Sequence, residues 1–108
     1  MPSHEVLLVM TSVASAAQAD AMTRALLEQR LAACIQRTCG ESSYHWQGRV
    51  TQSTEYYLHI KTSVALEKKL LAWLEAHHPY DTPELLVTTV EAQTAYAAWV
   101  QQETSEAS

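Results

Sequence analysis

Imidazole and carboxylate side chains gather in one short segment of the chain, residues 77 to 84. His77 and His78 are adjacent, and Glu84 follows after a turn that contains Pro79 and Pro83. Histidine nitrogens and carboxylate oxygens are common ligands of divalent metal ions. The segment therefore predicts a metal site made of His77, His78 and Glu84, and the usual affinity order of such donors favours Cu²⁺ over Zn²⁺.

The pattern predicts different surroundings for the two histidines. His77 continues an apolar helical stripe, so it is expected to pack against the core. Pro79 forces the preceding residue out of the helical conformation, so the helix is expected to end at His77 or His78. Adjacent helical residues point about 100° apart, so both rings reach one ion only if the helix has ended. His78 is therefore expected to be the better ligand, and the alternative is that both rings serve packing and the helix dipole alone.

Two sulfur atoms are candidate soft ligands for Cu(I). Cys34 and Met10 both lie in predicted strands, where packing is the commoner role for such side chains. Cys34 and Cys39 are five residues apart, so on one strand they lie about 17 Å apart and on opposite faces. A disulfide between them is excluded by that distance, and both thiols are expected to be free.

Other familiar chemistries leave no trace in the sequence. The chain has two glycines, and they are isolated, so no phosphate-binding loop or dinucleotide motif is present. No nucleophile triad is visible, and no organic cofactor is expected. Glu55, His59 and Lys61 share one face of a predicted strand and either line a cleft or form a solvated surface, of which the solvated surface is the simpler interpretation.

Periodicity and breakers predict the elements that position these residues. Residues 5–11 form a short apolar run, and residues 50–61 alternate between polar and apolar side chains, so both are expected to be strands. Ser15 and Gln18 resemble a capping box at the start of a helix. The expected elements are strand 5–11, a helix from Ser15 to Arg30, a long strand over 32–47, a turn at Gly48, strand 50–61, a helix from Ser63 to His77 or His78, strand 85–90, helix 94–102 and a frayed tail over 103–108.

This order predicts one α+β domain over residues 1–108. A β-α-β-β-α-β sequence with a C-terminal helix is the ferredoxin-like arrangement, in which helices cover one face of an antiparallel sheet. The other sheet face is then open, and the long hairpin extends beyond what two helices can cover. Aromatic side chains cluster on this hairpin, so homo-oligomerisation through the sheet and the hairpin is expected; they are Tyr44, Trp46, Tyr56 and Tyr57.

Composition excludes several classes of partner. The net charge is −5, and the seven basic residues are scattered along the chain, so neither nucleic acid nor a membrane surface is an expected partner. The first apolar run, Val6 to Met10, is too short for a signal-peptide core or a membrane span, so a cytoplasmic location is expected.

Several short motifs occur together in an order that resembles the CutA family of divalent-cation tolerance proteins. The resemblance covers residues 5 to 100. The motifs that carry it are Leu31 to Cys34 (LAAC), Ser43 to Gly48 (SYHWQG), Glu55 with the pair Lys61-Thr62, His78 to Glu84 (HPYDTPE), and Tyr96 with Trp99.

The resemblance implies a ferredoxin-like fold that assembles as a homotrimer similar to the PII signalling trimers. It also implies an association with copper and other divalent cations, and no catalytic activity. Its metal-associated positions are His77, His78, Glu84 and, more weakly, Cys34, while better-known bacterial members have a cysteine where this chain has Met10. Residues that it places in clefts between subunits are Tyr44, Trp46, Glu55, Lys61 and Tyr80.

Three functions therefore compete. The first is a cation-binding trimer linked to metal tolerance, which is the interpretation that we favour. The second is a PII-like sensor that binds a small anionic metabolite in the subunit clefts with the help of Lys61. The third is a purely structural trimer that responds to no ligand.

Overall fold

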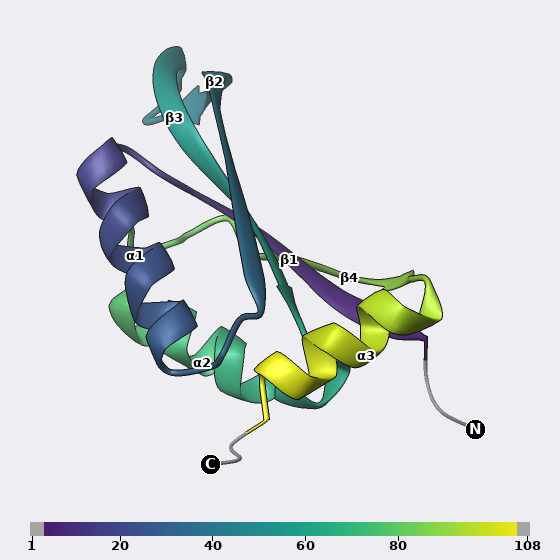
Figure 1. Ribbon diagram of the computed structural model, residues 1–108. Coiled ribbons are helices and arrows are strands. Elements are labelled where there is room, and N and C mark those ends of the chain that lie inside the picture. The colour runs from purple at the N-terminus through teal and green to yellow at the C-terminus, as the bar shows by residue number, and fades with distance from the viewer. Residues whose placement is uncertain (1–3, 106–108) are drawn as a thin grey trace.

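The computed structural model describes residues 4–105 (Figure 1). This part of the chain forms four strands and three α-helices, and a short 3₁₀ turn, Val64–Leu66, precedes the second helix. The elements are β1 (Glu5–Val13), α1 (Ala16–Glu28), β2 (Cys34–Trp46), β3 (Arg49–Thr62), α2 (Glu67–His77), β4 (Leu86–Glu91) and α3 (Thr94–Glu103).

The strands form one antiparallel sheet in the order β2-β3-β1-β4. Strand β1 lies inside the sheet, where Val9 pairs with Ile60 of β3 on one side and with Val87 of β4 on the other. The expected α+β, ferredoxin-like arrangement with a C-terminal helix is confirmed.

Alternation along β1 divides the apolar side chains between the two faces of the sheet. Leu7 and Val9 are fully buried in a cluster with residues of α1 and α2, which lie on the same side of the sheet (Figure 1). Val6 points to the other face and packs with Ala97 and Val100 of α3. Helix α3 therefore covers one end of the face that was expected to be open.

Among residues 4–105, no helix is both long and apolar enough to span a membrane.

Helix α1 begins as expected and ends two residues early. The Ser15 hydroxyl accepts the Gln18 backbone N–H, and the Gln18 side chain accepts the Ala14 N–H, one residue before the usual capping-box partner. At the other end Arg30 has a φ of 57°, and Leu31 N–H bonds to the Leu26 carbonyl. This is a Schellman ending with arginine where glycine is usual, so the sequence carried no signal for it.

Ser63 does not have its expected role, because it contacts the end of the C-terminal helix instead. Ser63 makes no side-chain cap at the start of the second helix. Its hydroxyl bonds instead to Thr104 Oγ1, 2.5 Å away, and Thr104 is buried and also donates to the Val100 carbonyl. Residues 103 and 104 are thus held at the end of α3, whereas residues 106–108 of the expected frayed tail lie outside the described part of the chain.

Strands β2 and β3 form a hairpin that extends far beyond the rest of the sheet. They contain 13 and 14 residues and are joined by Gln47 and Gly48, which both have positive φ, as a type I′ turn requires. This projection gives the molecule a long dimension of 49 Å, against 26 and 21 Å across (Figure 1). Cys34 and Cys39 on β2 are both free thiols, as the spacing predicted.

Two buried threonines on neighbouring strands provide a test of the core. Thr62 Oγ1 is a buried side-chain atom without a hydrogen-bond partner in the described part of the chain, whereas the buried Thr11 hydroxyl bonds to His78. Removing an unsatisfied buried hydroxyl is favourable, and removing a satisfied one is not. We expect Thr62→Val to raise the free energy of unfolding, and Thr11→Val to lower it, by about 1 kcal/mol each in urea denaturation. Equal losses in both variants would contradict this account.

Candidate functional site

The segment after α2 crosses to the end of strand β1 (Figure 1). His78 caps the helix, because its backbone N–H still bonds to the Leu74 carbonyl while its own φ and ψ, −70° and 139°, are extended. Pro79 imposes this conformation on the residue before it. The helix therefore ends at His77, as predicted, and the change of direction carries the His78 ring to the sheet.

Both ring nitrogens of His78 are used inside the protein. Nδ1 accepts the backbone N–H of Tyr80 at 3.0 Å, so the ring proton is assigned to Nε2. Nε2–H lies 3.0 Å from the Ser12 carbonyl and 2.9 Å from Thr11 Oγ1. Burial lowers the pKa of His78, against smaller raising effects of the Ser12 carbonyl and the Glu55 charge. Neutral His78 thus has no free lone pair for a metal, and it cannot take a proton from Thr11.

His77 has the opposite arrangement. Its exposed ring stacks on Trp73, with ring centroids 4.3 Å apart. Its Nδ1–H donates to the Trp73 carbonyl at 2.9 Å, which leaves the Nε2 lone pair free on an exposed ring. A histidine whose Nδ1–H is held by a backbone carbonyl is the usual form of a metal-binding histidine. The expectation that His77 packs in the core is wrong: it lies three residues after Leu74, the last buried residue of the stripe.

The other expected donors lie apart. Glu84 is exposed and precedes β4, and no described residue bonds to it. Cys34 is half-buried on β2, and its thiol contacts the Tyr96 hydroxyl of α3; burial and this thiol raise the pKa of Tyr96. Within residues 4–105, no three histidine, cysteine or acidic side chains are close enough together to hold a metal ion. One chain therefore does not bring His77, His78, Glu84 and Cys34 together.

Three of the five expected cleft residues do meet. The Tyr80 hydroxyl donates to Glu55 Oε2 at 3.0 Å, and burial, together with this bond and the Glu55 charge, raises the pKa of Tyr80 to about 12. Tyr44 is near enough to add to this shift. Lys61 lies elsewhere on β3 and donates to Gln36 at 2.6 Å, while Trp46 is 59% exposed at the hairpin tip.

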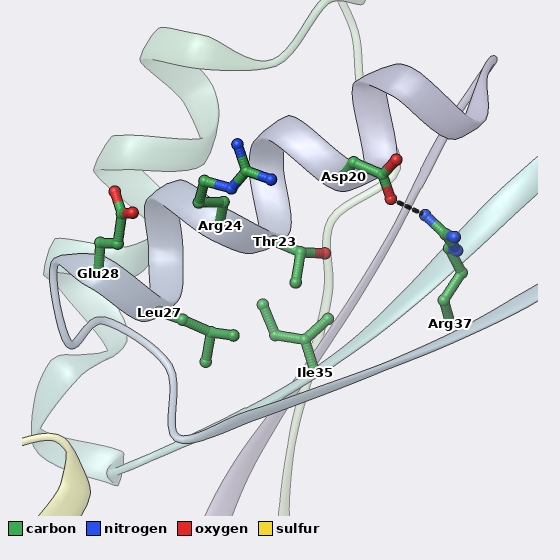
Figure 2. Close-up of a pocket in the computed structure, with 7 residues that line it drawn as sticks. All are labelled: Asp20, Thr23, Arg24, Leu27, Glu28, Ile35 and Arg37. Carbon is green, nitrogen blue, oxygen red and sulfur yellow. Dashed lines mark hydrogen bonds and ion pairs between the residues drawn. The ribbon is translucent and has the colours of Figure 1, made fainter.

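A groove that sequence reasoning did not predict lies between α1 and β2 (Figure 2). It has a volume of about 550 Å³, and an ion pair of 2.7 Å between Asp20 and Arg37 joins its two walls. Its two acidic and two basic side chains balance, so it favours neither sign of charge. The helical spacing of its α1 residues was the available signal; the lining residues are Asp20, Thr23, Arg24, Leu27, Glu28, Ile35 and Arg37.

Comparison with known proteins identifies relatives over nearly the whole chain. The family model described as CutA1 divalent ion tolerance protein matches residues 7–103. The divalent-cation tolerance protein CutA of Citrobacter koseri is 37% identical over 98 residues, which are 89% of this chain and 85% of that protein.

Solved structures show the same fold. CutA from Synechococcus elongatus superposes with a TM-score of 0.91 at 34% identity, over 97% of this chain and 95% of that one. The periplasmic divalent cation tolerance protein CutA from Archaeoglobus fulgidus has a TM-score of 0.88 over 93% of this chain and 99% of that one, and at 22% identity it shows the fold alone.

The buried state of His78 predicts how stability depends on pH. The lowered pKa of His78 in the folded protein means that below its ordinary value of 6.5 the unfolded chain binds the proton more readily. The contribution of neutral His78 to the free energy of unfolding is therefore fully present above that pH, and it is lost as the pH falls below it. Between about pH 7.5 and pH 5.5, we expect wild type to lose more free energy of unfolding than His78→Asn, measured by urea denaturation. Identical pH profiles would contradict this assignment.

Proposed function

The chain belongs to the CutA1 family of divalent ion tolerance proteins, and from this premise we propose that it is a non-catalytic, cytoplasmic homotrimer that binds divalent cations, copper above all. Two features support this proposal: the free imidazole lone pair at the end of α2, and the apolar surfaces that one chain leaves uncovered.

The observation that carries the cation proposal is the hydrogen bonding of His77. Its Nδ1–H is engaged by the Trp73 carbonyl, so the ring is held in one tautomer with Nε2 free. Imidazole nitrogen suits Cu²⁺, which in this class of site exceeds the other common divalent ions in affinity. A cation held by His77 alone would keep water at its other positions, so further donors could join it.

The remaining expected donors differ in how free their ligand atoms are to bind a cation. Exposed Glu84 keeps its carboxylate free for a cation, whereas Cys34 is in contact with Tyr96. His78 contributes only if its bonds to Tyr80 and β1 break. We therefore place His77 first among the proposed ligands, Glu84 second, and Cys34 and His78 after them.

The trimer is supported by the surfaces of the hairpin and of β4. Trp46 and Val50 near the hairpin tip are 59% and 72% exposed, and every residue of β4 is exposed, including Leu86 at 54%. Strands β2 and β4 are also the two edges of the sheet, with backbone groups available for pairing. Further copies of the chain would cover these edges and apolar side chains, so no other kind of partner is needed. In a closed ring of subunits related by rotation, each subunit contributes one hairpin and one β4 to the contacts.

The sensor and the scaffold alternatives have less support. A PII-like anion site needs Lys61 beside the residues of the proposed cleft, but Lys61 donates to Gln36 and lies six positions along β3 from Glu55. A purely structural trimer gives no reason for the His77 lone pair. A thermal shift with anionic metabolites and none with Cu²⁺ would favour the sensor.

Trp73 makes cation binding at His77 directly measurable. Because the two rings are stacked, Cu²⁺ on His77 should quench Trp73 fluorescence. In a chain that carries Trp46→Phe and Trp99→Phe, we expect saturable quenching by Cu²⁺, weaker quenching by Zn²⁺ and loss of the response in His77→Ala.

Two matched variants control this titration. His45→Ala removes an exposed imidazole on the hairpin, and His78→Asn removes the engaged one; both should leave the Trp73 response intact. Quenching that survives His77→Ala, or that is lost in His45→Ala, would place the cation elsewhere.

Assembly is tested by light scattering at micromolar concentration. The expected mass is three times that of the 12.0 kDa chain. Trp46→Ala removes an exposed aromatic side chain of the hairpin tip and should weaken the trimer, since truncating a buried interface Trp costs about 2–4 kcal/mol. A 12.0 kDa particle for wild type would refute the trimer, and an unchanged trimer in Trp46→Ala would exclude this residue as an anchor.

A further inference from the structure

The projecting hairpin leaves the sheet at a definable point. Strand β1 pairs with β3 only as far as Val13 opposite Tyr56, so residues 49–55 of β3 pair with β2 alone. We call residues 40–55 the arm, and Glu55 with Gly40 opposite it the root of the arm. A two-stranded ribbon is marginal in stability and twists more than a larger sheet. The direction of the arm therefore depends on the contacts made at its root.

One contact lies beside the root, on the part of β2 that precedes the arm and faces the helices. Arg37 donates to Asp20 of α1 at 2.7 Å, and its guanidinium lies 5.9 Å from the centre of the Tyr56 ring. The two paired side chains are 40% and 63% exposed. An ion pair in such contact with water is weak and is screened by salt, so it cannot fix the arm by itself.

The other contact comes from the turn after α2 and is better protected. The Tyr80 hydroxyl donates to Glu55 at the root, and both residues are half-buried. A hydrogen bond to a carboxylate is stronger than one between neutral groups. The backbone of Tyr80 is itself held by His78, whose other nitrogen bonds to the Ser12 carbonyl and to Thr11.

These bonds form a continuous chain from β1 to the arm. Ser12 and Thr11 hold the His78 ring, the ring holds the Tyr80 backbone, and the Tyr80 side chain holds Glu55. We propose that His78 and Tyr80 form a clasp that sets the direction of the arm and so presents Trp46 to a neighbouring copy of the chain. His78 is in this view a positioning residue that acts through Tyr80. The part that concerns the neighbouring copy rests on the trimer proposed above.

The geometry of the clasp provides a conservative variant. The bond from Tyr80 N–H to the side chain two residues earlier is the bond that an asparagine makes in an Asx turn. His78→Asn therefore keeps the hold on Tyr80 but cannot reach β1, whereas His78→Ala loses both. The expected order of arm disorder is wild type, His78→Asn, His78→Ala.

The test compares two phenols that are both half-buried. Tyr80→Phe removes the bond to the root, and Tyr57→Phe removes a bond to Ser42 that lies within the hairpin. Nitroxide labels are placed by Val50→Cys near the arm tip and Glu75→Cys on α2, in a chain with Cys34→Ser and Cys39→Ser. Pulsed EPR then gives the distance distribution between tip and body, with excess unlabelled chain present so that each distance lies within one copy.

We expect one narrow distribution for the parent chain and for Tyr57→Phe, and a broadened one for Tyr80→Phe and His78→Ala. In the unlabelled variants, the trimer dissociation constant should rise about tenfold in Tyr80→Phe, which corresponds to about 1.4 kcal/mol. A distribution in Tyr80→Phe as narrow as in Tyr57→Phe overturns the clasp. A monomeric wild type would instead refute the trimer and leave the distance measurement as the test of the clasp.

Discussion

The pairing of β1 with its two neighbours is the constraint on which the rest of the molecule depends. Strand β1 supplies Leu7 and Val9 to the core under α1 and α2, and Val6 to the packing of α3 on the other face. Its last residues also provide the carbonyl and the hydroxyl that hold His78. Because the pairing with β3 stops at Val13, β1 also decides where the sheet ends and the free hairpin begins.

Two adjacent histidines acquire opposite chemistry from the hydrogen bonds at their ring nitrogens. His77 donates a hydrogen bond from Nδ1–H to a carbonyl one helical turn earlier and keeps the Nε2 lone pair free on an exposed ring. His78 accepts a backbone N–H at Nδ1 and donates from Nε2, so it has nothing left to offer a cation. The difference follows from Pro79, because one residue remains in the helix while the next is turned towards the sheet.

A single copy of this chain leaves apolar side chains of the hairpin and of β4 exposed. The hairpin extends away from the body, and β4 is exposed along its whole length. The homotrimer that we propose would cover these surfaces with further copies of the chain. The donors that one chain keeps apart would then be arranged relative to those of the next copy by the direction of the hairpin.

The sequence by itself determined the local structure. Backbone preferences and the period of the side chains can be recognised within a short stretch of sequence. They account for the alternation over 50–61, the apolar run in β1, the Gly48 turn and the helix end before Pro79. The order of these elements then led to the ferredoxin-like sheet, and the family motifs led to the resemblance. The end of α1 and the role of Ser63 were missed because arginine is an unusual Schellman residue and because Ser63 finds Thr104 only in the folded chain.

Only the tertiary structure decided the chemistry of the candidate site. The partners of Nε2 of His78 are 66 and 67 residues away in sequence, and Tyr80 meets a carboxylate 25 residues away. The distant partners on β1 engage Nε2 of His78, whereas spacing along the chain led to the expectation of a ligand at His78 and a packed ring at His77. The folded chain reverses both expectations. His77 bonds to a carbonyl one turn earlier in its own helix and stays exposed, while the bonds of His78 to β1 form only once β1 and the turn after α2 have come together.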